Sequence, residues 1–219
     1  MQNKSYRRKP YTVLMDWYRY SNIRIPFFNP VARTILKTKI AIDKLLLKSY
    51  SISEKKMLKD LNQLNLFFLV GFPRSGTTFM ANVLNKLLAD WNVVHEPFIG
   101  DYLLSVNYPQ IKNSKEYFHK IRLKDIYRRV ERGNCKGYGE SNPHIRLCTP
   151  YIKDIFPSAS VFYIVRDPRD VVRSMMNREI LRPKDPMQKL YVPPADDSDF
   201  KGWNKMSRFE KICLLWKYD

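Results

Sequence analysis

The stretch LFFLVGFPRSGTTFMANVLNKLL, residues 66–88, contains the signals that decide the fold. It begins with apolar, β-favouring residues, turns through Gly71, Pro73 and Gly76, and continues with a helical pattern. A strand that enters a helix through such a turn directs the unpaired N–H groups of the helix N-terminus at whatever occupies the turn. The stretch therefore predicts a site for an anion such as phosphate or sulfate.

Short apolar runs and helical patterns alternate along the rest of the chain, as is typical of βαβ units. The candidate strands are residues 66–71, 92–96, 136–140 and 160–165, and the candidate helices are residues 77–89, 114–131, 144–155 and 168–180. We therefore predict an α/β fold with a parallel β-sheet flanked by helices. Because ligands of such sheets bind at the carboxyl ends of the strands, functional residues are expected directly after each strand.

The turn itself, GFPRSGTT, is rich in groups that bind anions. Arg74 supplies a forked cation, Gly76 lets a ligand approach the backbone closely, and three hydroxyls come from Ser75, Thr77 and Thr78. The spacing of the glycines matches the nucleoside-triphosphatase motif GxxxxGK[ST], but Thr77 stands where that motif requires lysine. A typical Mg-ATP site is therefore disfavoured. The alternative interpretation is a tight strand-to-helix turn with a solvated arginine.

A second anion-binding pattern follows the strand SVFYIV, in the segment RDPRDVVRSMMNREI. Asp167 can cap the helix and Pro168 suits its first turn, which places Arg166 at the carboxyl end of the strand. Ser174 lies two turns into the helix, where its hydroxyl and Arg166 could together bind a second phosphate. The alternative is that Arg166 pairs with Asp167 or Asp170 and that Ser174 is an ordinary helix serine.

Taken together, the two segments resemble the donor-binding motifs of the sulfotransferases that use PAPS, 3'-phosphoadenosine 5'-phosphosulfate. The resemblance covers about residues 66–180, is weaker in FEKICLLWKYD, and implies a P-loop NTPase-like sulfotransferase fold. It further implies PAPS as the sulfuryl donor, PAP as the product, and no metal. The residues implied to bind the 5'-phosphosulfate are Arg74, Ser75, Gly76, Thr77 and Thr78, and those implied to bind the 3'-phosphate are Arg166 and Ser174.

Transfer of a sulfuryl group to an alcohol needs in-line positioning, donors for the departing oxygen, and a base for the hydroxyl proton. Arg74 and the amides of its loop can stabilise the bridging oxygen as PAP departs. The second strand ends in VVHEPF, and strand alternation predicts that only one of His95 and Glu96 points into the cleft. The resemblance favours Glu96 as the base over His95. Alternatively, the pair caps a turn before Pro97.

The third strand ends in GYGESNPHIR, which resembles a segment that commonly reads GEKTP or GEKNP in relatives. Ser141 replaces the lysine that approaches the sulfuryl group or the acceptor in those proteins, so His144, Arg146 or a residue beyond Asp219 is a candidate substitute. Glu140 is expected either to orient Arg74 or hold the acceptor, or to pair with a nearby lysine.

Composition narrows the class of partner. The chain has 219 residues and a net charge of +18, which favours phosphate-bearing or sulfate-bearing partners and acidic membrane surfaces. With the resemblance, this predicts a nucleotide donor and a hydroxyl acceptor that is a carbohydrate or an anionic glycan rather than a small phenol, and no nucleic acid. Two rival hypotheses are a P-loop kinase and a non-catalytic protein that binds polyanions or membrane surfaces.

The chain divides into a basic helical N-terminal extension, residues 1–64, and a sulfotransferase domain, residues 65–219, expected to be incomplete at its C-terminus because relatives continue further. Helical patterns cover residues 31–50 and begin again after Ser53. A proline-rich loop at residues 182–204 is expected to be a lid or binding loop. The three cysteines lack paired spacing and are expected to be free thiols. No transmembrane segment is expected, although peripheral membrane contact is compatible with the charge, and the expected compartment is the cytoplasm.

Overall fold

In the computed structural model, the described residues are 34, 38, 41, 51–105, 107, 111, 113–133, 135–178, 180–182, 193 and 198–219. Most of the helical pattern predicted for residues 31–50 and most of the predicted loop at 182–204 lie outside them. The division at residue 64 remains a prediction. Within the described ranges, no helix is long and apolar enough to cross a membrane.

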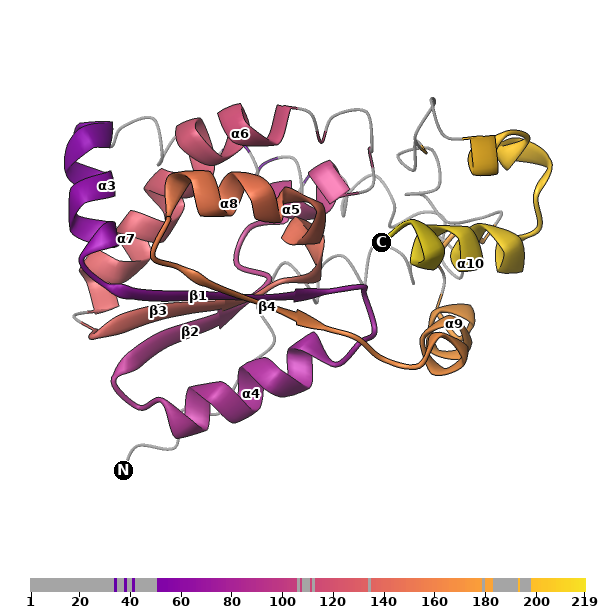
Figure 1. The fold of residues 1–219 in the computed structure, drawn as a ribbon, viewed down its shortest axis with the longest axis horizontal. Helices are drawn as coiled ribbons and strands as arrows, with labels where there is room; N and C mark the ends of the chain where they lie inside the picture. Colours follow the sequence, from indigo (N-terminus) through magenta and orange to yellow (C-terminus); the bar gives the residue numbers. More distant parts are fainter. Residues whose placement is uncertain are drawn as a thin grey trace.

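Four parallel strands form one sheet, which confirms the predicted α/β fold (Figure 1). They are β1 (Asn65–Gly71), β2 (Trp91–His95), β3 (Gly137–Ser141) and β4 (Ser160–Ile164), and their order across the sheet is β2-β3-β1-β4. Each lies within one residue of its predicted bounds. β1 is buried over all but its first residue, as expected for a central strand covered on both faces.

Helices cover both faces of the sheet, with α4 on one face and α8 on the other (Figure 1). The helical segments before β3 are α3 (Glu54–Asn62), α4 (Thr77–Leu87), α5 (Ile99–Ser105), α6 (Ser114–Tyr117), the π-helix η3 (Phe118–Arg122) and α7 (Leu123–Gly133). Those after β3 are the 3₁₀-helix η4 (Pro143–Cys148), α8 (Thr149–Ile155), α9 (Pro168–Met176), the 3₁₀-helices η6 (Ser198–Phe200) and η7 (Trp203–Lys205), and α10 (Arg208–Tyr218).

The helix predicted over residues 114–131 is therefore three consecutive segments, with a π-helical turn between α6 and α7. The predicted caps are present at two other helices. Ser53 accepts a hydrogen bond from Lys56 N at α3, and Asp167 accepts one from Arg169 N at α9, where Pro168 occupies the first turn. The start of α9 directly after Arg166 is thus confirmed.

Two hydrophobic clusters support the edge of the sheet where the strands end. One packs β1 and β3 against α3, α7 and α8 and includes Phe68, Tyr138 and Phe156. The other joins the residue after β1, Phe72, to α9 and α10. Figure 1 shows α9 and α10 beyond the carboxyl ends of the strands. All three cysteines are free thiols, as predicted.

Gly139 in β3 lies directly opposite Phe67 in β1, and a Cβ atom at Gly139 would lie 2.1 Å from the Phe67 ring. The ring itself is held between Trp91 and Phe162, at centroid distances of 5.5 and 6.4 Å. We therefore expect Gly139→Ala to lower the free energy of unfolding by about 1–3 kcal/mol through overpacking. Urea denaturation measures this, with the exposed strand substitution Ser160→Ala as the control. Equal stability of the two variants would contradict the close approach.

Candidate functional site

The turn between β1 and α4 leaves the start of α4 without a side-chain cap and has open space at Gly76. Gly71 passes so close to β4 that a Cβ atom there would lie 2.5 Å from the carbonyl oxygen of Ile164. Arg74 has φ 79° and Gly76 has φ 109°, and a Cβ atom at Gly76 would meet no heavy atom within 4 Å. Because Gly76 offers no side chain to cap α4, the first N–H groups of this 11-residue helix are available to an anion.

Direct hydrogen bonds join this turn to the second predicted motif. Arg74 Nε donates to Ser174 Oγ at 3.0 Å, and Arg166 Nη1 donates to the carbonyl oxygen of Arg74 at 3.2 Å. Arg166 Nη2 also lies 3.5 Å from Asp170 Oδ2, which is the ion pair of the alternative interpretation. The two predicted anion sites therefore occupy the same edge of the sheet, close enough for one ligand to contact both.

His95 connects the turn to the ends of β2 and β3. Its Nδ1 lies 2.8 Å from the carbonyl oxygen of Ser141, which can only accept a hydrogen bond, so Nδ1 carries a proton. In the neutral ring, Nε2 then accepts a hydrogen bond from Thr78 Oγ1 at 2.9 Å. Ser141 Oγ donates to the carbonyl oxygen of Thr77 at 2.8 Å. His95 and Ser141 are both buried and hold β2 and β3 against the start of α4.

Glu96 approaches the same site, contrary to the expectation that only one of the pair would do so. Strand alternation ends at Glu96, which has φ 41°, and its Oε1 lies 3.4 Å from His95 Nε2 and 3.6 Å from His144 Nε2. Burial opposes ionisation of Glu96, but the electrostatic interaction and hydrogen bond with His144, together with the nearby His95 and Arg74, outweigh it and lower the pKa of Glu96 to about 2. The carboxylate is therefore ionised at neutral pH.

The two residues considered as substitutes for the missing lysine have different surroundings. His144 lies beside Glu96, receives further contacts from Ser105 Oγ at 3.2 Å, and packs edge-on against the Tyr102 ring at 5.0 Å. Arg146 is nearly buried, forms an ion pair with Asp219, and lies 5.3 Å above the Phe72 ring. Of the two, His144 is the one positioned beside the predicted base.

Glu140 was expected to contact Arg74, the acceptor or a lysine, and these expectations were wrong. It is fully buried, and Arg122 Nη2 donates to both of its carboxylate oxygens, at 2.6 and 2.5 Å. Asp101 Oδ1 lies 3.1 Å from Arg122 Nε, and Asp125 Oδ2 lies 2.7 Å from Nη1. All four side chains have no solvent-exposed area. We call Arg122, Asp101, Asp125 and Glu140 the buried ionic cluster.

The buried ionic cluster ties β3, α5, η3 and α7 together behind the site. Asn142, the residue after β3, donates to both Asp101 Oδ2 and Glu140 Oε1 at 2.8 Å. Burial raises the pKa of Asp101 to about 6, even though Arg122 opposes this shift. Nothing in the sequence pattern singled out Arg122, because it lies in a basic, helix-forming stretch that looks solvent-exposed.

Comparison with known proteins gives one match. A family model described as the sulfotransferase domain matches residues 65–206. Searches of curated proteins and of solved structures found no match. Among the residues that the structure describes, no group of three or more His, Cys, Asp or Glu side chains is arranged to hold a metal ion.

Arg122→Met should lower the free energy of unfolding by about 3–5 kcal/mol, because it leaves buried carboxylates without their counter-charge. The matched control is Lys120→Met in the same helical segment, where the lysine is 70% exposed and pairs with Glu116. This control should change stability by less than about 1 kcal/mol. Chemical denaturation followed by circular dichroism measures both. A fully stable Arg122→Met variant would show that the carboxylates do not depend on this arginine.

Proposed function

Because this chain belongs to the sulfotransferase domain family, we propose that it transfers a sulfuryl group from PAPS to a hydroxyl group of a carbohydrate or glycan acceptor. The observation that carries the choice of donor is the direct contact between the two predicted anion sites, Arg74 with Ser174 and Arg166 with the Arg74 carbonyl. A nucleotide with phosphate groups at both its 3' and 5' positions can occupy two adjacent anion sites, whereas a single anion would occupy only one of them.

The residues of the turn fit the 5'-phosphosulfate of such a donor. The uncapped N-terminus of α4 and the open space at Gly76 allow the ligand to approach the backbone, and Arg74 can donate to it from the side. The hydroxyls of Ser75, Thr77 and Thr78 are further candidate donors. PAPS, when bound, supplies the activated sulfuryl group and departs as PAP. Arg166 and Ser174 would hold the 3'-phosphate.

Glu96 is proposed to accept the proton of the acceptor hydroxyl. It is ionised at neutral pH because His144, His95 and Arg74 hold its pKa at about 2, and it lies next to His95, which contacts Thr78 of the turn. A carboxylate with so low a pKa is a weak base in water, so its contribution depends on being positioned against the hydroxyl. His95, whose Nε2 accepts a hydrogen bond from Thr78, is the alternative base.

The choice of acceptor rests on charge and on the segment that carries Glu96. The net charge of +18 suits an acceptor that already carries anionic groups. A glutamate after the second strand is more typical of sulfotransferases that modify glycans than of those that modify small phenols. A cytoplasmic location remains a prediction from sequence.

PAP should raise the melting temperature of the chain, whereas ATP with magnesium should not, because only the first ligand has phosphates for both anion sites. At a concentration of about 100 times the Kd, the stabilisation amounts to about 2.7 kcal/mol.

Arg74→Ala and Arg166→Ala should each weaken PAP binding about tenfold or more in calorimetry. Arg169→Ala is a suitable control, because Arg169 is 89% exposed and pairs with Asp167. If neither Arg74→Ala nor Arg166→Ala weakens PAP binding, the donor assignment is wrong.

Glu96→Gln should lower kcat about 100- to 10,000-fold while PAP affinity stays within about twofold, since the base acts on the acceptor proton and not on the donor. The ordinary enzyme should not lose activity through protonation of Glu96 between about pH 8 and about pH 5, because a depressed pKa keeps the carboxylate ionised until the pH falls toward about 2. Steady-state rates at several pH values measure this. A larger loss in His95→Gln than in Glu96→Gln would transfer the role to His95.

A further inference from the structure

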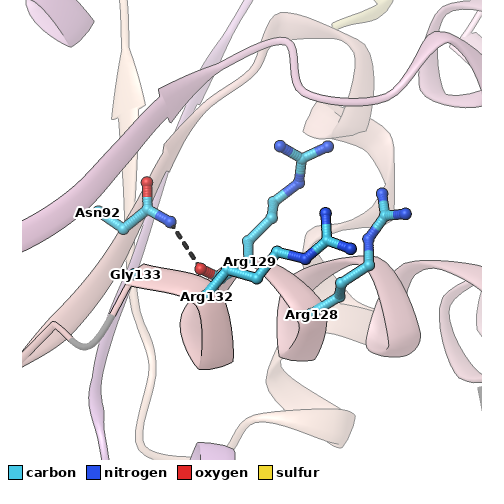
Figure 2. A pocket seen from close by; sticks show the side chains of 5 residues that line it. All are labelled: Asn92, Arg128, Arg129, Arg132 and Gly133. Carbon is cyan, nitrogen blue, oxygen red and sulfur yellow. Dashed lines mark hydrogen bonds between the residues drawn. The ribbon is translucent and has the colours of Figure 1, made fainter.

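A pocket of about 260 Å³ lies against the edge strand β2, next to α7. Its lining residues are Asn92, Arg128, Arg129, Arg132 and Gly133, and we call it the arginine pocket. Figure 2 shows the three arginine side chains projecting in the same general direction from α7, with Asn92 approaching from the strand. None of these residues belongs to the donor site described above.

The sequence of α7 places these cations on one face of the helix. Asp125, Arg128, Arg129 and Arg132 are spaced at three, four and seven residues, which is the repeat of a single helical stripe. Arg129 Nε lies 2.8 Å from Asp125 Oδ2, and Arg128 Nη2 lies 3.3 Å from Oδ1. Asp125 also pairs with Arg122, which Asp101 and Glu140 contact as well. Against these three carboxylates stand the four cations Arg122, Arg128, Arg129 and Arg132, so the adjoining groups keep a formal surplus of one positive charge.

The nearby acid on α7 faces another way. Glu131 acts electrostatically on Lys56 and Tyr127, which places it toward α3. The stripe that lines the arginine pocket therefore keeps a surplus of positive charge. Such a surplus at a concave surface attracts anions and favours their binding.

Two hydrogen bonds hold the pocket in shape and connect it to the proposed base. Asn92 Nδ2 donates to the carbonyl oxygen of Arg129 at 3.0 Å, which holds α7 against β2. Arg129 Nη2 donates to the carbonyl oxygen of Pro97 at 3.1 Å, and Pro97 directly follows Glu96. Asn92 lies in β2, and Glu96 directly follows the last residue of that strand. At the usual rise per strand residue, Asn92 and Glu96 are therefore about 13 Å apart.

The size and chemistry of the pocket select a ligand class. Guanidinium groups bind sulfate and carboxylate groups through paired hydrogen bonds. A volume of about 260 Å³ is below the range of about 300–1,000 Å³ typical of pockets for whole small molecules, so it suits one charged substituent better than a nucleotide.

We propose that the arginine pocket binds a sulfate or carboxylate group of an extended anionic glycan while a hydroxyl of the same chain reacts beside Glu96. The inference rests on the proposed function and makes it more specific. An acceptor that spans about 13 Å must contain several sugar units, so a monosaccharide or a small phenol cannot occupy both places.

The test compares two double variants of the full chain. Arg128→Ala/Arg132→Ala removes two charges from the pocket, and Lys86→Ala/Lys205→Ala removes two exposed charges elsewhere. Binding of a heparin-derived octasaccharide is measured by calorimetry at several salt concentrations, and binding of PAP is measured in parallel. The arginine variant should bind the octasaccharide about tenfold more weakly and with a smaller salt dependence, whereas the lysine variant should stay within about twofold. Both should keep the original PAP affinity.

Further arms separate folding defects and other ligands. Arg132→Ala alone leaves the contacts of Asp125 in place and should still weaken octasaccharide binding about threefold. With a desulfated octasaccharide, the difference in affinity between the two double variants should be smaller. Equal octasaccharide affinity in both double variants overturns the proposal, as does a larger loss of binding to phosphatidylserine vesicles than to the octasaccharide. Absence of PAP binding by the original chain would instead refute the donor assignment. The octasaccharide affinities of the variants would still test the arginine pocket, because that measurement does not require PAP.

Discussion

The carboxyl ends of four parallel strands meet at one edge of the sheet, and the candidate site depends on this arrangement. β1 lies between β3 and β4, so the turn that follows it is adjacent to residues delivered by both neighbours. Arg166 comes from the end of β4, and Ser141 from the end of β3 contacts Thr77. The same order brings His95 from the outer strand β2 to within hydrogen-bonding distance of Thr78. A different strand order would separate these groups without changing any local pattern.

A second constraint is the buried ionic cluster around Arg122. Placing an arginine and three carboxylates out of water is unfavourable unless each charge has close partners, and here Arg122 contacts all three acids. Two tyrosine hydroxyls, of Tyr117 and Tyr138, and the Asn142 amide provide further donors to Asp101 and Glu140. The cluster therefore fixes α5 and the end of β3 relative to each other. Those two elements carry Ser105 and the chain that leads to His144, beside Glu96.

Positive charge has two separate uses on the adjoining segments η3 and α7. Arg122, at the end of η3, is fully buried and neutralised, and it serves to hold the structure together. Arg128, Arg129 and Arg132, further along α7, line a pocket beside the edge strand, where one carboxylate does not balance their charge. Asp125 connects the two uses, because it pairs with both Arg122 and Arg129. Arg129 in turn contacts the carbonyl oxygen of Pro97, which follows Glu96.

Local patterns in the sequence were sufficient to predict the four strands, the turn at Gly71 to Gly76 and the start of α9, because apolar periodicity, glycine and capping residues act over a few neighbouring positions. They could not predict the φ of Glu96, the partner of Glu140 or the arginine pocket, since these depend on contacts between distant segments. Arg74 and Ser174 are 100 residues apart, and Arg122 meets Glu140 only because α7 returns the chain to β3. The sequence by itself determined which elements form and which polar residues follow them. Only the packing of those elements decided which charges are buried together and which face a ligand.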